Sequence, residues 1–291
     1  MKTSIKTYLY FLIGSLISFL TSYFLKVKLG LNQDVFDFEI EGEKDVFILG
    51  TGDSINKINK NGWHRINKGF SIGINYFFIH KFVPNVIQLE LNEGKDKFYF
   101  ENLNKIFHSR ENEFKSSIIL IKSNFHFHNL KKKKIFLSSI PASLKSNIKF
   151  CIDFPVPSKS LNEFKSAIKI LRKMKFFTKQ NNTCVPHLRA SIGLTTVLCI
   201  QNEVKNIYFG GVDLLNKKTF FDKEKLSKNY SIRFNEQEIE QKHGTDDRNI
   251  SEITISEVLK ILNEDQNIST NLHTVSEFSV LRDYLNHVNI N

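Results

Sequence analysis

Short apolar runs, each closed by a glycine or a polar residue, recur along the chain after residue 44. Runs of this kind are typical of strands that are buried on both faces of a parallel sheet. We therefore expect a first strand at 45–50. Further strands are expected at 70–75, 86–91, 117–121, 148–153, 206–213 and 272–275.

Apolar residues at helical spacing lie between several of these strands. Phe164 and Ile168 share one face of an expected amphipathic helix at 162–173. Helices are also expected at 191–201, where the helix is buried, and at 253–262, and a short helix should follow the last strand. This alternation predicts an α/β fold with a Rossmann-like, mostly parallel sheet flanked by helices.

The first 30 residues differ from the rest because no charged residue lies between Lys6 and Lys26. Residues 8–25 are dominated by Leu, Ile and Phe, close to the ~20 residues that a helix needs to cross a bilayer. A cleaved secretory signal is the alternative, but residues 26–29 are not the small residues that cleavage needs. We expect three parts: a membrane anchor at 1–30, a linker at 31–44 and one domain at 45–291.

Small residues recur every four positions in the expected anchor. Gly14, Ser18 and Ser22 form a pattern that supports helix pairing in membranes, which allows a homo-oligomer. Two lysines on each side of the segment leave its orientation undecided by the positive-inside rule.

Composition places the chain among folded proteins. Apolar residues make up 41% and charged residues 24%, which excludes a disordered tail, a collagen-like repeat and a multi-span channel. The net charge of +11 favours an anionic partner, such as a phosphorylated substrate or a lipid surface. The three cysteines form no Cys-x-x-Cys pair, so we expect reduced thiols in the cytosol.

Residues 50–54, Gly-Thr-Gly-Asp-Ser, follow the first expected strand. Free backbone amides in such a turn, at the start of a helix that Asp53 or Ser54 caps, favour a phosphate. A tight structural turn is the alternative, because the Lys-Ser/Thr of a P-loop and the third glycine of the dinucleotide fingerprint are missing. The strand at 206–213 should deliver Asp213 to the same carboxyl edge of the sheet, where ligands bind.

His243 lies in a polar stretch before a helix, where an imidazole can act as a general base. An exposed loop histidine is the alternative interpretation. His126 and His128 are taken as structural, because no carboxylate or cysteine lies close to complete a metal site. The chain has no Asp-x-Asp triplet either, so we expect no metal.

Two segments of the chain are rich in lysine. Residues 220–241 are polar and lack steady periodicity, which predicts a mobile loop or lid. Including its flanking residues, this lid is expected at about 216–242. Lys131–Lys134 is interpreted as a solvated loop between strands, with a phosphate or lipid-headgroup contact as the minority alternative.

Taken in order, several segments resemble the bacterial lipooligosaccharide sialyltransferases of glycosyltransferase family 42, which use a CMP-activated nonulosonic acid. Residues 46–54 are similar to the family's first strand and Gly-Asn-Gly-Pro-Ser turn. Residues 74–78 are similar to its Asn-Gln-Phe-Tyr-Phe stretch. Residues 189–193 and 207–213 resemble its Arg-x-Thr-Ser-Gly helix and Tyr-Leu-Ser-Gly-Ile-Asp strand, and His243 precedes a Thr-Asp and a helix, as the family's catalytic histidine does.

The resemblance spans most of residues 45–290 and implies a GT-A-variant-like fold with a role for each matching position. It implies that His243 removes the acceptor proton and that Arg189 lies near it in the active site. The donor-binding residues that it implies are Gly50, Thr51, Gly52, Ser54, Asn75, Ser191, Gly193, Asp213 and the lid residue Tyr230.

The chain departs from the family pattern at a few positions. Leu214 and Leu215 stand where the family has Phe-Tyr, so the tyrosine that helps to hold the leaving phosphate is missing, and Tyr230 is its expected substitute. Asp53 and Ile192 depart as well. These differences indicate a divergent relative with a different donor or acceptor.

The resemblance implies an inverting, metal-independent glycosyltransferase without a cofactor. Its expected donor is a CMP-activated sialic acid, a related nonulosonic acid or Kdo, and its expected acceptor is a lipooligosaccharide or capsule glycan. It would work as a single-pass protein of the cell inner membrane, with the catalytic domain in the cytoplasm and no nucleic-acid partner. Two alternatives stay open: a diphosphokinase-like enzyme that needs ATP and magnesium, and a basic, membrane-tethered binding module.

Overall fold

The computed structural model describes residues 2–29, 40, 45–91, 97–124, 130–156, 160–178, 184–215, 218–221, 243–249 and 252–291. Within these ranges the centre of the fold is a nine-stranded sheet in which every strand pair is parallel. The strands are β1 Val46–Leu49, β2 Phe70–Ile74, β3 Val86–Glu90, β4 Ile118–Asn124, β5 Ile148–Pro155, β6 Cys184–His187, β7 Asn206–Gly210, β8 Asn271–Thr274 and β9 Asn286–His287.

The strand order is β6-β5-β4-β3-β2-β1-β7-β8-β9. The chain builds outward from β1 to β6 and then crosses back to place β7 on the other side of β1. This crossover makes the pair of strands β1 and β7 a topological switch point of the sheet. A parallel sheet offers its ligand crevice at such a topological switch point, outside the carboxyl ends of the strands.

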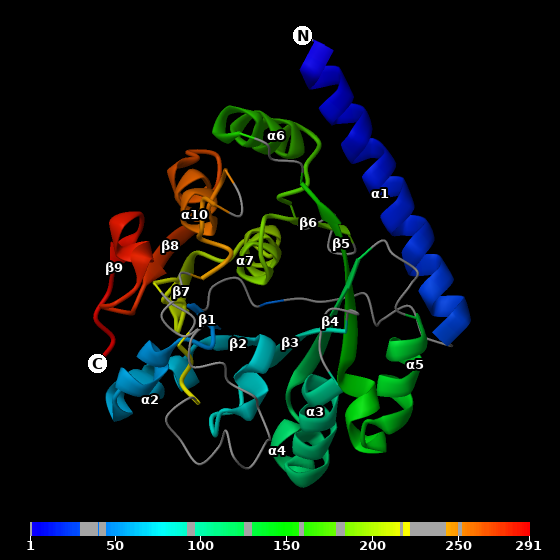
Figure 1. Ribbon diagram of the computed structural model, residues 1–291, viewed down its shortest axis with the longest axis vertical. Coiled ribbons are helices and arrows are strands. Elements are labelled where there is room, and N and C mark those ends of the chain that lie inside the picture. Colours follow the sequence, from blue (N-terminus) through cyan, green and yellow to red (C-terminus); the bar gives the residue numbers. More distant parts are fainter. Residues whose placement is uncertain are drawn as a thin grey trace.

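Helices cover both faces of the sheet (Figure 1). Val46 and Ile48 of β1 belong to one hydrophobic cluster, which the helices α6, α7 and α10 complete, while Phe47 and Leu49 belong to a second cluster with α2, α3 and α5. The α-helices are α1 Lys2–Leu29, α2 Lys60–Lys68, α3 Lys97–Ser109, α4 Glu111–Phe114, α5 Leu130–Ser139, α6 Leu161–Lys173, α7 Ser191–Gln201 and α10 Ile255–Glu264. The 3-10 helices are η2 Asp53–Lys57, η3 Asn75–Ile79, η5 Ala142–Asn147 and η7 Val280–Asp283.

The helix α1 packs along the domain, against β5, β6 and α6 (Figure 1). Phe11 is completely buried, and Ser18 and Ser22 are buried too. The small-residue pattern that suggested pairing between chains is therefore used within the chain. Residues Ile5–Leu29 form a helix long and apolar enough to cross a bilayer, a property that signal sequences and core helices share.

The expected α/β architecture is confirmed: strands occur at or near each predicted position, and the helices at 162–173, 191–201 and 253–262 are present. The strand predicted at 206–213 ends at Gly210, so Asp213 lies in the loop beyond it. The strand after α6, β6, was not predicted, nor were α3 and β9.

Two local predictions were wrong. The helix after the glycine turn is the short η2, which no side chain caps, and the next helix, α2, is capped by the Asn59 side chain instead of Asp53 or Ser54. The lysine run Lys131–Lys134 belongs to α5, and Lys133 is buried rather than solvated.

Only residues 218–221 of the expected lid are described. Phe220 and Phe221 are buried, although they were assigned to the polar loop, and the Phe220 amide donates to the Thr51 carbonyl at 2.9 Å. Three residues discussed above lie outside the described residues: His126, His128 and Tyr230.

Candidate active site

A cavity of about 540 Å³ opens at the carboxyl ends of the strands, beside the switch point between β1 and β7. Its volume is typical of sites for small molecules. It is lined by the turn after β1, the loop after β7, the amino terminus of α7 and polar side chains from β3, β4 and β6. The lining residues are Gly50, Thr51, Gly52, Ile74, Asn75, Glu90, Lys122, His187, Arg189, Ala190, Ser191, Ile192, Gly211, Val212, Asp213, Leu214, His243 and Thr245.

Most of the site residues named from the sequence meet at this cavity. Eight of the eleven line it: Gly50, Thr51, Gly52, Asn75, Arg189, Ser191, Asp213 and His243. Ser54 and Gly193 lie behind the wall, where they hold neighbouring segments in place. Tyr230 is outside the described residues.

The glycine turn joins β1 to β7 rather than offering its amides to a ligand. The Gly50 amide donates to the Gly210 carbonyl at 2.8 Å, and the Gly52 amide donates to the Gly211 carbonyl at 2.7 Å. A Cβ atom at Gly50 would lie 2.4 Å from the Gly211 oxygen, so the close approach of the two loops requires glycine. The expectation that these amides are free for a phosphate is wrong for Gly50 and Gly52.

Asp213 fixes the same corner of the site. Its carboxylate accepts hydrogen bonds from the Ser54 amide at 2.9 Å, from the Ser54 hydroxyl and from the Ser276 hydroxyl at 3.1 Å. These bonds tie the turn after β1, the loop after β7 and the segment after β8 together. Asp213 therefore shapes the wall of the cavity, and Ser54 contributes through Asp213.

The amino terminus of α7 also lines the cavity. Its N-cap residue, Ala190, has no side chain that can bond to the amides of the first turn, and the helix is eleven residues long. Unsatisfied amides and the helix dipole favour an anion at such an end. Gly193 permits this position of the helix, because a Cβ there would lie 1.9 Å from the Leu188 carbonyl oxygen.

Two cavity residues combine a strained backbone with unsatisfied polar atoms. Asn75 and Arg189 have φ angles of 55° and 66°, in the left-handed region that favours glycine. Asn75 Oδ1 and Arg189 Nε are buried and have no hydrogen-bond partner within the described part of the chain. The first atom can accept a hydrogen and the second can donate one, so a ligand with both kinds of group would complete them.

His243 faces the cavity from a loop that is fixed to α10. The Asp246 amide donates to the His243 carbonyl at 2.8 Å, and buried Asp246 accepts from the Ser256 amide at 3.1 Å. The His243 Nδ1 atom lies 2.8 Å from Thr245 Oγ1. The Thr245 amide also donates to Nδ1 at 3.4 Å when that atom carries the lone pair. In the other tautomer, with hydrogen on Nδ1, the Thr245 hydroxyl accepts that hydrogen and the Nε2 lone pair can take a proton.

Sequence reasoning missed a charged cluster on another part of the wall. Lys122 Nζ lies 2.8 Å from Glu90 Oε1, 3.4 Å from His187 Nε2 and 3.9 Å from Asp153 Oδ2. His187 Nδ1 lies 3.1 Å from Asp153 Oδ2. Because Asp153 is buried, its carboxylate holds the imidazole with Nδ1 as donor, and Nε2 then accepts from Lys122 Nζ.

Three of its four members had a signal in the sequence, whereas His187 had none because its strand was not predicted. Each member is a polar residue in or at the carboxyl end of an apolar strand: Glu90 in β3, Lys122 in β4, Asp153 in β5 and His187 in β6. The same positional rule had already selected Asp213. A Ser191 hydroxyl bond to Glu90 connects the cluster to α7.

The described residues contain no group of three His, Cys, Asp or Glu side chains that could hold a metal ion. Metal independence stays a prediction. The three thiols, Cys151, Cys184 and Cys199, are free and buried, and burial raises the pKa of each, for Cys184 to about 11. They take no part in the cavity.

A second cavity of about 600 Å³ lies near α2 and the loop after η3. Trp63, His80 and Phe220 are among its lining residues, and its charged groups Arg110 and Glu113 bond to each other at 2.7 Å. None of the described residues that line it belongs to a strand. We therefore assign the chemistry to the cavity at the switch point, although the second cavity is slightly larger.

No protein-family model matches the chain, and a search of curated proteins finds no significant match. Among solved structures, the chain is similar to the sialyltransferase CST-II in complex with a trisaccharide acceptor and CMP, with 17% identity, 85% of this chain and 88% of that chain covered, and a TM-score of 0.47. The sialyltransferase CstII from Campylobacter jejuni in complex with cytidine-5'-monophosphate gives 15% identity, 85% and 86% coverage and a TM-score of 0.46.

Proposed function

We propose that the protein is an inverting glycosyltransferase that moves sialic acid, a related nonulosonic acid or Kdo from a CMP-sugar to a lipooligosaccharide or capsule glycan, without a metal ion. The observation that carries the proposal is the meeting of eight residues, named from separate segments of the sequence, around one cavity at the switch point of the sheet. Four features of the cavity fit an anionic nucleotide-sugar: the buried Asn75 acceptor, the buried Arg189 donor, the uncapped first turn of α7 and the charged cluster around Lys122.

The nucleotide is proposed to lie between the loops after β1 and β2. Asn75 Oδ1 is a buried acceptor without a partner among the described residues, so it suits the amino group of cytosine or a ribose hydroxyl. Arg189 Nε and the uncapped first turn of α7 suit the phosphate, because both supply donors and positive potential. The phosphate is therefore proposed to bind at the amino terminus of α7 and not at the glycine turn, where the sequence analysis expected it.

The transfer is proposed to be a single displacement. The acceptor hydroxyl oxygen attacks the anomeric carbon, the bond from that carbon to the phosphate oxygen breaks, and CMP leaves with the bonding electrons. The hydroxyl proton passes to His243 Nε2, in the tautomer whose Nδ1 hydrogen bonds to Thr245. Arg189 and the α7 amides stabilise the charge on the departing phosphate.

The missing family tyrosine bears on that last step. Leu215 stands at its position and is 53% exposed. Because leucine has no hydroxyl group, this position offers no hydrogen-bond donor to the phosphate. Arg189 is therefore proposed to carry most of the leaving-group stabilisation, and Tyr230 remains a proposed second donor.

The charged cluster is proposed to bind the transferred sugar. Glu90, Lys122 and His187 follow β2 outward along the sheet, so they lie beyond the proposed nucleotide subsite. A carboxylate, an ammonium group and an imidazole together can bind hydroxyl groups and a sugar carboxylate. The enzyme is proposed to work at the cytoplasmic face of the inner membrane, where α1 attaches it.

The test is release of CMP by the purified full chain from a panel of CMP-activated keto-acid sugars, with EDTA present. We expect release from at least one donor, and CMP binding by calorimetry. Asn75→Ala should weaken CMP binding by up to about tenfold, the value of one hydrogen bond, whereas Asn162→Ala on the exposed face of α6 should not. Turnover that needs ATP and magnesium would indicate the diphosphokinase-like alternative, and absence of CMP binding would refute the proposal.

One observation from the structure argues against the binding-module alternative. Its expected surface included Lys131–Lys134, but Lys133 is buried inside the fold. Burial lowers the pKa of Lys133 to about 8, against a smaller opposing effect of Asp153. The run is therefore not a continuous cationic surface.

A further inference from the structure

The helix α1 has two unlike faces. Its docked face consists of Phe11, Gly14, Ser18, Thr21, Ser22 and Leu25, which are all buried. The Phe11 ring meets the Phe154 ring edge to face at 5.9 Å, and the Tyr10 hydroxyl donates to the Pro155 carbonyl at 3.0 Å. Small residues let the helix approach β5 and β6 closely, so α1 is an integral layer of the domain.

The opposite face of α1 is apolar and exposed. It carries eleven of the sixteen exposed large apolar side chains in the described residues. We call it the outer face, and it consists of Ile5, Tyr8, Leu9, Leu12, Ile13, Leu16, Ile17, Phe19, Leu20, Tyr23 and Val27. A contiguous apolar patch of this extent is far more than a soluble monomer normally exposes to water.

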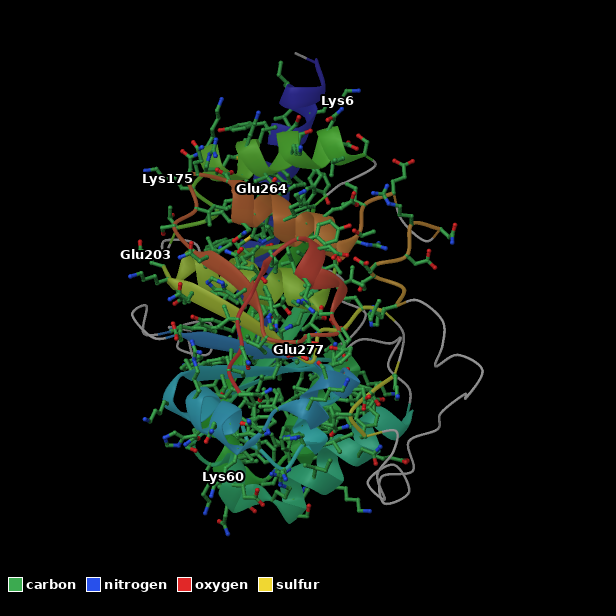
Figure 2. All side chains as sticks on the ribbon, turned by 90° about the vertical axis from the view of Figure 1, so that its left-hand side faces the viewer. Lys6, Lys60, Lys175, Glu203, Glu264 and Glu277 are labelled. Carbon is green, nitrogen blue, oxygen red and sulfur yellow. The ribbon has the colours of Figure 1, made fainter. Side chains whose placement is uncertain are left out.

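Charge identifies the occupant of the outer face. The helix contains no Asp or Glu, and all four of its charged residues are lysines near its ends, of which Lys6, labelled in Figure 2, and Lys28 are exposed. The whole chain carries a net charge of +11. An apolar strip between cationic ends is complementary to a bilayer with anionic headgroups, where apolar side chains enter the acyl boundary and lysines meet phosphates.

The docked face is incompatible with a helix that crosses the bilayer. A spanning helix needs ~20 residues within the hydrocarbon. The residues from Phe11 to Leu25 are covered on one side by β5, β6 and α6, so spanning would draw these elements into the hydrocarbon as well. The exposed lysines Lys165 and Lys169 of α6 would then lose their water, at a high cost.

We propose that α1 lies in the plane of the membrane, with its outer face in an anionic lipid surface and its docked face on the domain, so that the protein is monotopic and does not span the bilayer. This inference does not depend on the proposed chemistry. The domain covers the small-residue face of α1 and supplies the polar side of the assembly, which the helix alone lacks.

The orientation is tested by thiol labelling of the full chain in the membrane. Lys6→Cys and Lys28→Cys place single reactive thiols at the two ends of α1, and Lys173→Cys marks the exposed surface of the domain. The three native thiols give little background because they are buried. With a membrane-impermeant reagent, we expect all three variants to label from the same side of the membrane. Labelling of residues 6 and 28 from opposite sides would overturn the proposal.

The role of the outer face is tested by flotation of the purified full chain with vesicles of phosphatidylcholine, with and without phosphatidylglycerol. We expect stronger binding with the anionic lipid. Phe19→Gln, at a side chain that is 68% exposed, should weaken binding about tenfold, whereas Phe278→Gln, at 52% exposure far along the chain, should not. Equal binding by both variants, or a soluble dimer that does not float, would overturn the proposal.

Discussion

Replacing Gly193 by alanine tests whether the amino terminus of α7 forms the donor site. The added Cβ would lie 1.9 Å from the Leu188 carbonyl oxygen, and real Cβ atoms essentially never approach other atoms below 3.0 Å. The obstructing atom belongs to the backbone, so no flexible side chain can yield. The first turn of α7 must therefore move by roughly 1 Å, together with Ser191 and Arg189.

The displacement has two expected costs. Overpacking of this kind destabilises a protein by ~1–3 kcal/mol, and each kcal/mol lowers the melting temperature of a chain of this size by ~2–4 °C. A misplacement of 1 Å in a positioning group lowers turnover by ~100-fold. We expect Gly193→Ala to show both effects, with weaker CMP binding because the α7 amides no longer meet the phosphate.

Gly210→Ala is the matched control. Its added Cβ would lie 3.4 Å from Leu49 Cδ2 and Val275 Cγ2, which is ordinary contact. Melting curves, CMP calorimetry and CMP release are measured on both variants. If Gly193→Ala melts, binds and turns over like Gly210→Ala, then α7 does not set the donor site and the phosphate assignment is wrong.

Three further predictions concern single side chains. His243→Ala should lower turnover by ~10²–10⁴-fold and leave CMP affinity unchanged, because a general base acts in the chemical step. If steady-state kinetics show full turnover for this variant, His243 is not the general base. Asp153→Asn should lower kcat/KM by ~10–100-fold by releasing the His187 ring, and equal kinetics would exclude the sugar subsite. Burial, aided by Lys81 and Arg110, lowers the pKa of His80 to about 4 from 6.5. The folded state therefore favours the neutral ring, so its contribution to stability is complete above pH 6.5 and is lost as the pH falls toward 4. Urea unfolding across this range should show the loss, and His80→Phe should reduce it.

The strands of the inner sheet were predictable because their burial on both faces leaves a plain apolar run. The strand β6 was not, since Cys184–His187 is short and contains a proline. A proline is tolerated there because β6 is an edge strand, and edge position is a property of the whole sheet. The missed strand also hid His187.

The positions of the site were more predictable than their roles. The rule that ligands bind at the carboxyl ends of parallel strands, together with the family resemblance, pointed to residues that meet at one cavity. The sequence could not show that the Gly50 and Gly52 amides bond to the end of β7 and to the residue after it, because those partners lie about 160 residues away in the chain. The pairing of Asp153 with His187 was hidden because β6, the strand that carries His187, was not predicted.

The unsatisfied atoms of Asn75 and Arg189, held on strained backbone, mean that the empty protein is less stable than it would be with its ligand. Any compound that supplies the missing partners should raise the melting temperature, by the equivalent of ~2.7 kcal/mol at a concentration 100 times its dissociation constant. Nucleotides and activated sugars can thus be ranked by thermal shift before any acceptor glycan is known.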